Sequence, residues 1–292
     1  MRKQNYLNNK DMLKEIHKSK LTYCYVLDDD YSRFDVIVES IDDIKNSEVI
    51  QTAKENRARQ LSNKAYEEAY YTWYDNEARK QSQKPKQTNF KLDPSTIDEE
   101  DLIFRVMTYD HIPLEPGRKN KPKTEADKHA KCNFPPFQHY ANVNGEMKEV
   151  LRSHWEGGLD NGHFNVQHGN ITNNLAKMYI KLCERYSMRS NWRGYTYVDE
   201  MRSHALLQLS QIGLQFNELK SENPFAYYTA AVTNSFTRVL NLEKRNQNIR
   251  DDLLQEAGQM PSWTRQIEHE MAERAKWDEK SDKERKEHGF NV

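Results

Sequence analysis

The most regular pattern of apolar and polar positions lies after residue 170. Apolar side chains over residues 175–186 recur at intervals of three and four, which predicts an amphipathic helix. A second helix is predicted over residues 198–217. A third begins at Asn223, which can cap it, before Pro224 in the first turn. We therefore expect an all-α bundle over residues 165–258.

Residues 20–164 show a mixed pattern that predicts a small α+β domain inserted before this bundle. The first two expected strands flank the acidic run Asp28-Asp29-Asp30 and suggest a hairpin. The last two are joined by Asn144-Gly145, a pair that tolerates the positive φ angles of a type I′ turn. The expected strands cover residues 22–27, 35–39, 102–113, 137–143 and 147–155.

Further helices complete the predicted α+β fold. Residues 8–18 form a short helix in the N-terminal segment 1–19, which is expected to pack on the bundle, with Asn9 as its cap. Ser47 is expected to cap a long helix that ends near Gln83. A lysine-rich stretch at 116–132 has no periodicity and is expected to be a basic loop. Residues 259–292 are expected to form a charged helical tail.

The third helix of the expected bundle carries an aromatic side chain, amides and cations on the side opposite its apolar residues. Such groups can stack on a base, bond to a base edge and neutralise phosphate. A solvated polar face is the alternative interpretation of the same pattern. The candidate DNA-binding residues are Tyr227, Asn234, Thr237, Arg238, Asn241, Lys244 and Arg245.

The second helix of the expected bundle, residues 198–217, has two apolar stripes. A surface helix needs only one stripe to reach its own core, so the second stripe suggests a docking surface. Packing against residues 20–160 of the same chain is the alternative. The candidate docking residues are Glu200, Ser203, Leu207, Gln211 and Leu214.

Composition and charge narrow the class of protein. The chain has 292 residues, of which 36% are hydrophobic and 30% charged, and its net charge of −1 excludes an indiscriminate polycation. Residues 170–250 nevertheless hold 11 Lys and Arg against 6 Asp and Glu, so positive charge is concentrated there. Three widely spaced cysteines argue against a disulfide framework and favour a reducing compartment. No signal peptide or membrane-length apolar run is visible.

No catalytic set, metal site or cofactor motif is expected, so the sequence does not predict an enzyme. The glycine-rich run 157–162 lacks the lysine and hydroxyl of a phosphate loop and is typical of a turn. Cys183 lies on an apolar stripe and should be an inert packing residue. The acidic run 28–30 has no strand–helix context for a metal-dependent site. One His/Cys group has the wrong spacing for zinc, although a metal-dependent nuclease built on it is a further alternative: His129, Cys132 and His139.

The run Val232–Leu240, VTNSFTRVL, resembles the run I-R-Q-A-I-T-R-A-I of primary bacterial sigma factors. That run belongs to the helix which opens and reads the −10 promoter element. Asn234 stands where the family has its base-reading Gln, and Thr237 and Arg238 match it. In the same frame, Tyr227 falls on the aromatic residue that stacks on a flipped-out base.

A closer similarity is to the late-transcription sigma factors of T-even-type bacteriophages. The motifs are NYLNNKDMLKEI at residues 5–16, NWRGYTYVDEM at 191–201 and NPFAYYTAAVTNSF at 223–236. Phe216 also matches the Phe that closes the preceding sigma helix. Residues 20–160 have no counterpart in the smaller family members.

The resemblance implies a sigma factor that directs host core RNA polymerase to phage late promoters in the cytoplasm of the infected bacterium. The helix over residues 198–217 would grip the β′ clamp helices of the polymerase. The helix from Asn223 would recognise and melt an AT-rich −10-like element. The alternative is an accessory polymerase-binding module without promoter recognition.

The sequence also departs from the family. Ala230-Ala231 stand where primary sigma factors carry a Trp pair that wedges the duplex open, which fits an AT-rich element that melts with less help. No domain for the −35 element is recognisable. A hydrophobic and acidic C-terminal tail contacts the sliding clamp in the phage family, whereas this chain ends in EHGFNV. The resemblance thus suggests a sliding clamp and a co-activator as further partners.

Overall fold

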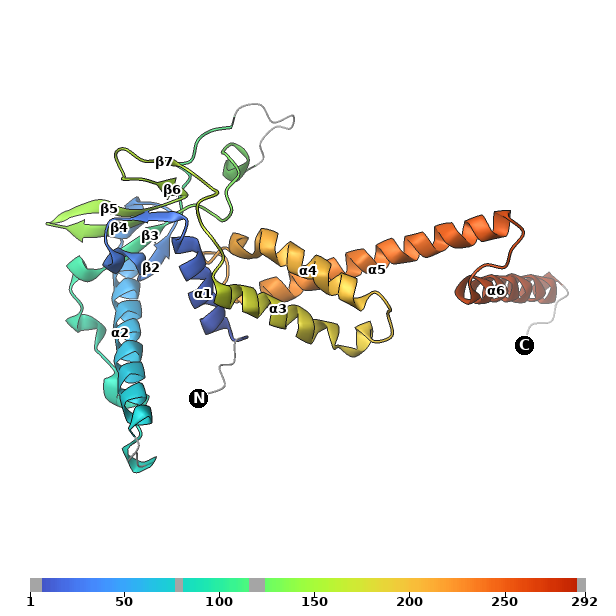
Figure 1. Cartoon of the computed structure of the whole chain (residues 1–292), viewed down its shortest axis with the longest axis horizontal. Coiled ribbons are helices and arrows are strands. Elements are labelled where there is room, and N and C mark those ends of the chain that lie inside the picture. The colour runs from blue at the N-terminus through green and yellow to red at the C-terminus, as the bar shows by residue number, and fades with distance from the viewer. Residues whose placement is uncertain (1–6, 77–80, 116–123, 288–292) are drawn as a thin grey trace.

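The computed structural model describes residues 7–76, 81–115 and 124–287, and it has the expected mixed α+β composition (Figure 1). The helices are α1 (Asn9–Leu21), α2 (Ser47–Asp75), α3 (Asn173–Ser187), α4 (Val198–Ile212), α5 (Pro224–Glu256) and α6 (Trp263–Glu287). The strands are β1 (Cys24–Val26), β2 (Val36–Val38), β3 (Ile103–Val106), β4 (Gln138–Val143), β5 (Glu146–Ser153), β6 (Trp155–Glu156) and β7 (His163–Phe164).

Strands β1 to β5 form one sheet in the order β1-β5-β4-β3-β2, in which only β2 and β3 are parallel. The predicted β4–β5 hairpin is confirmed, with φ angles of 57° at Asn144 and 83° at Gly145. The predicted hairpin between the first two strands is wrong. Both strands exist, but β1 pairs with β5 and β2 with β3, so they lie at opposite edges of the sheet.

Several predicted boundaries also change. The cap of α1 is Asn8 and the cap of α2 is Asn46, one residue earlier than expected in each case. Helix α2 ends at Asp75, and the strand expected over 102–113 is confined to β3. The lysine-rich segment 116–123 lies outside the described residues.

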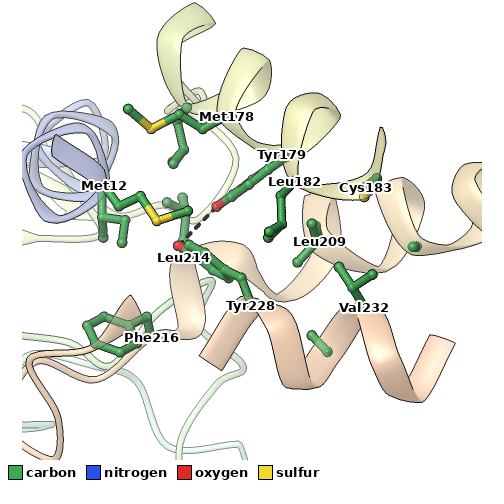
Figure 2. Packing of buried hydrophobic residues seen from close by; sticks show 14 of the residues in the cluster. Met12, Met178, Tyr179, Leu182, Cys183, Leu209, Leu214, Phe216, Tyr228 and Val232 are labelled. Carbon is green, nitrogen blue, oxygen red and sulfur yellow. Dashed lines mark hydrogen bonds between the residues drawn. The ribbon is translucent and has the colours of Figure 1, made fainter. Parts of the chain in front are cut away.

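Helices α1, α3, α4 and α5 pack around one apolar core (Figure 2). The predicted core stripe of α3 is confirmed, because every apolar residue of its pattern is buried. Met12 and Ile16 bring α1 into the same core with fully buried side chains. Two tyrosines link the bundle internally: the Tyr179 hydroxyl donates to Tyr228 Oη at 3.2 Å, and Tyr228 donates to the Gly213 carbonyl at 2.8 Å.

The bundle core continues into the region of the sheet, because Tyr23, Phe134, Phe137 and Leu151 belong to the same buried cluster as the helices. The sheet also has apolar clusters of its own, one of which packs against α2. The inserted region and the bundle therefore share part of their stabilising apolar surface.

The two ends of the inserted region meet between α1 and α3. The Thr172 amide donates to Ser19 Oγ at 3.0 Å, and the Thr172 hydroxyl donates to Glu15 Oε2 at 3.0 Å. One turn further, the Asn170 amide donates to Thr22 Oγ1 at 2.9 Å, and this hydroxyl donates back to the Asn170 carbonyl. Thr172 also caps α3, so these contacts fix where the bundle resumes.

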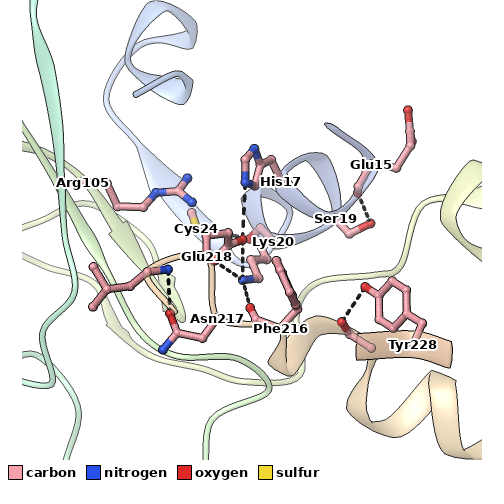
Figure 3. Close-up of polar contacts among 12 residues, drawn as sticks. Glu15, His17, Ser19, Lys20, Cys24, Arg105, Phe216, Asn217, Glu218 and Tyr228 are labelled. Atoms are coloured by element: carbon pink, nitrogen blue, oxygen red, sulfur yellow. Dashed lines mark hydrogen bonds and ion pairs between the residues drawn. The ribbon is translucent and has the colours of Figure 1, made fainter. Parts of the chain in front are cut away.

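A buried ion pair joins α1 to the segment between α4 and α5 (Figure 3). Lys20 Nζ donates to Glu218 Oε1 at 2.7 Å, to Oε2 at 2.8 Å and to the Phe216 carbonyl at 2.8 Å. The Lys20 side chain is 0% exposed and that of Glu218 is 5% exposed. Burial lowers the pKa of Lys20 to about 8, although the negative charge of Glu218 acts to raise it. Burial opposes ionisation of Glu218 as well, but the Lys20 charge outweighs it and holds the Glu218 pKa far below its usual value.

A second buried cation lies between the sheet and this ion pair. The Arg105 guanidinium is sandwiched between the rings of Phe34 and Phe137, at 3.8 and 3.9 Å from their centroids. Its Nε donates to His139 Nε2 at 2.9 Å. Arg105 is 0% exposed, and burial lowers its pKa to about 10.

Helix α5 extends beyond the bundle, and α6 follows at its far end, away from the sheet (Figure 1). Asp251 near the end of α5 accepts hydrogen bonds from the Ser262 amide at 2.8 Å and from its hydroxyl at 2.6 Å. Arg265 pairs with Asp252 at 2.8 Å. Across the described ranges, no helix combines the length and apolar character needed to cross a bilayer.

We predict that Glu218→Gln lowers the free energy of unfolding by about 3–5 kcal/mol, because it leaves the Lys20 ammonium buried without a counter-charge. Guanidinium unfolding of both proteins measures the difference. Glu273→Gln is the matched control, since it removes a carboxylate from an exposed pair with Lys276 and should change stability little. Equal effects of the two substitutions would contradict a structural role for the buried pair.

We also predict that the protein loses stability as the pH falls from about 6.5 towards 4. His154 is fully buried, with its ring 4.0 Å from that of Phe134, and burial lowers its pKa to about 3. Because this folded-state pKa lies below the value of about 6.5 for a histidine in an unfolded chain, only the unfolded chain gains the proton in this window. His154→Phe should reduce the pH dependence of denaturant unfolding, and part of the dependence that remains comes from His111, whose pKa burial lowers to about 4. The exposed His204→Phe should leave the pH dependence as in the wild type, and identical profiles for the two variants would refute the prediction.

Candidate nucleic-acid interface

The polar face of α5 is solvent-exposed along the middle of the helix. Its position is set at the start of the helix, where Asn223 Oδ1 accepts from the Ala226 amide at 3.0 Å and Pro224 occupies the first turn. The opposite face is buried in the bundle through Val232, Phe236 and Val239. The exposed candidates are Asn234, Thr237, Arg238, Asn241, Lys244 and Arg245.

The dimensions and chemistry of this face suit a nucleic acid. At about 1.5 Å per residue, Asn234 and Arg245 are about 16 Å apart along the helix axis, the rise of about five base pairs. Amides and a hydroxyl can bond to base edges, and the cations can bind phosphates. Since the helix is anchored by its buried side, these groups keep a fixed relative arrangement.

Tyr227 differs from the other α5 candidates because it is half-buried. Its hydroxyl donates to the Ile212 carbonyl at 3.2 Å, and its ring meets that of Phe216 edge-on with centroids 5.6 Å apart. Tyr227 and Asn234, seven residues apart, lie on the same side of α5, but Asn234 is exposed whereas the Tyr227 ring is partly covered. The loop that closes α4 folds over the start of α5 and covers part of the ring. Burial raises the pKa of Tyr227, so it remains a hydrogen-bond donor.

Tyr227 lines a cavity of about 1050 Å³ between the bundle and the inserted region. The segment 215–227 supplies one part of the lining, and residues 107–110, 124–129 and 135–136 supply much of the rest. Sequence reasoning missed these inserted residues, because no periodic pattern or motif links them to a segment so distant along the chain.

The proposed docking stripe on α4 is partly changed by the structure. Leu207 is 55% exposed, and its polar neighbours Glu200, Ser203 and Gln211 are exposed as well. Leu214 is only 5% exposed and belongs to the bundle core (Figure 2), so its assignment to the exposed stripe is wrong.

The geometry after α4 explains the burial of Leu214. The α-helix ends at Ile212, and the chain continues as the 3-10 helix η9 (Gly213–Gln215). A Cβ atom at Gly213 would collide with the Tyr179 hydroxyl, so only glycine lets the chain pass this close. Leu214 lies in this 3-10 turn, where its side chain packs in the core of the bundle.

Of the three residues weighed as zinc ligands, His139 lies apart from His129 and Cys132, which both neighbour Tyr109. His139 is fully buried and contacts Arg105, while His129 stacks on Tyr109. Burial raises the pKa of Cys132 to about 11, which keeps it a thiol. Over the ranges that the structure describes, no cluster of three His, Cys, Asp or Glu side chains suits a metal ion.

Two minor predictions concern residues outside the interface. The glycine-rich run forms a turn, in which the Trp155 indole donates to the Gly158 carbonyl at 3.0 Å. Cys183 is buried in the bundle, as predicted. Residues 288–292, considered for a sliding-clamp contact, lie outside the described residues.

Comparison of the chain with models of known families, with curated proteins and with solved structures gave no match. The similarity to sigma factors therefore rests on the motifs of the sequence.

The geometry of α5 predicts the salt dependence of duplex binding. Arg238→Ala, Lys244→Ala and Arg245→Ala should each lower the slope of log K against log salt concentration by about 0.9, because each removes one released counterion. The slope is measured by fluorescence anisotropy with duplex DNA between roughly 50 and 200 mM salt, a range over which such salt effects are large. Lys64→Ala on the remote helix α2 is the control. If the slopes of all three variants equal that of the wild type, these residues do not contact phosphates and form only a solvated polar face.

Proposed function

We propose that this protein is a sigma factor that directs bacterial core RNA polymerase to phage late promoters. The observation that carries the proposal is the exposed face of α5, which presents amides, a hydroxyl and cations in fixed order from a rigid bundle. The similarity of Val232–Leu240 to the promoter-reading helix of sigma factors supports it. A polar face that only contacts solvent would have no reason to carry amides, a hydroxyl and cations at the positions that match the sigma motif.

In this proposal, α4 binds the polymerase and α5 binds the promoter. Leu207, with Glu200, Ser203 and Gln211 around it, binds the β′ clamp helices of the polymerase. Because α4 packs directly on α5, docking of α4 fixes the position of α5 over an AT-rich −10-like element.

Contacts to DNA follow from the chemistry of the exposed face. Arg238, Lys244 and Arg245 bind phosphates, which contribute affinity but no sequence preference. Asn234, together with Thr237 and Asn241, bonds to base edges in the duplex. Tyr227 stacks on a base once it has left the duplex, since its ring is partly covered and lines the cavity.

The absence of a Trp pair affects duplex opening in this proposal. Ala231 is 8% exposed and packs in the core, and Ala230 is exposed beside it. Two methyl groups offer little surface to wedge between base pairs. Opening therefore relies on capture of extruded bases and on the weak stacking of an AT-rich element.

Promoter-dependent transcription tests the proposal directly. Purified core polymerase, this protein and a cloned late promoter should give a run-off transcript that core polymerase alone does not give. If the protein binds core polymerase but supports no initiation with any late promoter of the phage, it is an accessory polymerase-binding module instead.

We predict that Leu207→Asp weakens binding to core polymerase by at least tenfold, because it places a charge in an apolar contact. Co-purification and biolayer interferometry with core polymerase measure the loss. Ile180→Asp is the matched control, since Ile180 is 44% exposed on α3 and lies outside the docking stripe. Wild-type affinity of Leu207→Asp would exclude α4 as the docking helix.

A further inference from the structure

The second half of α2 carries aromatic side chains that neither the core nor the proposed function uses. Helix α2 runs away from the sheet, and its far end lies at the edge of the molecule (Figure 1). Its buried residues, Ala53 and Ala58, both lie in its first half. Six rings that belong to no buried apolar cluster form what we call the α2 aromatic surface: Tyr66, Tyr70, Tyr71, Trp73, Tyr74 and Phe90.

These rings lie side by side along the helix. The centroid of Tyr70 is 5.6 Å from that of Trp73 and 6.3 Å from that of Tyr74, whose ring is nearly parallel to it at 18°. Tyr66 lies 6.0 Å from Tyr70 and 6.1 Å from Phe90. From Tyr66 to Tyr74 the helix rises about 12 Å, the length of about three to four stacked bases. Each ring is at least partly exposed, so the surface is accessible to a ligand.

The segment that follows α2 returns along the helix and brings positive charge to these rings. It is held in place where Gln87 Nε2 donates to Asn63 Oδ1 at 2.9 Å. Residues 81–91 contain three lysines and no carboxylate. Among them, Lys84 places its ammonium 5.9 Å from the centroid of the Tyr70 ring.

The carboxylates of this part of α2 are neutralised or face away from the rings. Glu67 pairs with Lys10 of α1 at 3.6 Å. At 3.6 residues per turn, Glu68 and Asp75 lie about 160° and about 140° around the helix axis from Tyr70. The side that carries the rings therefore combines stacking surfaces with ammonium groups. This combination is the one that binds single-stranded nucleic acid with little sequence preference.

We propose that the α2 aromatic surface is a binding site for single-stranded nucleic acid. Bases stack on the rings around Tyr70, and phosphates lie towards Lys84 and the returning segment. A base-paired duplex does not bind in this way, because its bases already stack on one another. The site goes beyond the proposed function and does not depend on it, since it belongs to the inserted region and needs neither polymerase nor promoter sequence.

Photocrosslinking of the full-length protein without polymerase locates the bound strand. The probes are strands of thymidine or of uridine, each about eight nucleotides long, within the range of about 4–16 that one single-strand-binding module covers. Each carries one 5-iodopyrimidine, which on excitation links to an aromatic ring in contact with it. Mass spectrometry should find the link on Tyr70 or Trp73. The strand that gives the higher yield identifies DNA or RNA as the preferred source.

Competition shows whether the linked site takes only unpaired bases. An excess of unlabelled single strand should abolish the links on α2, whereas an excess of duplex of the same sequence should leave them. Links confined to residues outside 66–90 would overturn the proposal. Absence of links on α2 together with protection of Tyr71, which is 62% exposed, by core polymerase would also overturn it, in favour of a protein-docking surface.

Substitutions measure the contribution of the rings. Trp73→Ala should weaken binding of the better strand about 5- to 150-fold in fluorescence anisotropy, the range expected for one lost stacking partner. Trp73→Phe keeps a ring and should retain most of the affinity. The measurement is made at about 200 mM salt, where contacts of the α5 cations with phosphate are weak. Lys84→Ala should lower the salt slope by about 0.7, the value for one phosphate contact to a single strand.

Trp277→Ala is the matched control for Trp73→Ala. It removes a tryptophan that is 72% exposed on α6, far from the α2 aromatic surface, and should bind like the wild type. Neither ring belongs to a buried cluster, so both variants should keep the melting temperature of the wild type. Equal affinities of the two variants would overturn the proposal. Since no polymerase is present, either result leaves the sigma assignment to be decided by the transcription assay.

Discussion

The ion pair between Lys20 and Glu218 is the interaction on which the rest of the structure most depends. Transfer of both charges out of water is costly, and the pair is tolerated because Lys20 also donates to the Phe216 carbonyl while Glu218 accepts from it at two oxygens. These bonds hold the end of α4 and the start of α5 against α1. The cavity, the half-covered ring of Tyr227 and the direction of the α5 polar face all follow from the position of this one segment.

The arrangement places two different surfaces on one rigid body. Apolar Leu207 lies on α4, while the polar and cationic groups lie on α5, and the two helices pack against each other over most of the length of α4. A partner bound to one helix therefore sets the position of the other without any conformational change in the bundle. Arg105 and its two phenylalanine neighbours link the sheet to the same core region, so the inserted part keeps a defined place beside the helices.

Whether a feature could be predicted from the sequence depended on how far apart along the chain its interacting residues lie. The α3 stripe, the Asn223 cap and the Asn144-Gly145 turn are local signals, and each was found from neighbouring residues. The predicted pairing of β1 with β2 was wrong, because the strands that outcompete a local hairpin are distant along the chain: Cys24 pairs with Ser153, and Val36 pairs with Phe104. Leu214 was misplaced because the close approach of Gly213 to Tyr179 ends α4 early. The place of Tyr109 and His129 beside Tyr227 was missed, because only the folded chain brings these residues together.

The contacts that close the inserted region at its base, between Ser19 and Thr172 and between Thr22 and Asn170, have an evolutionary consequence. With its two ends tied together, the inserted region can vary in length away from the core that it shares with the bundle. The entropy of closing such a loop grows only slowly with its length, by about 0.6 kcal/mol for each doubling. A lineage can therefore enlarge or shorten those parts of the inserted region that lie outside the shared core while the helices keep their register, and selection can act on the cavity wall with little effect on the helical framework.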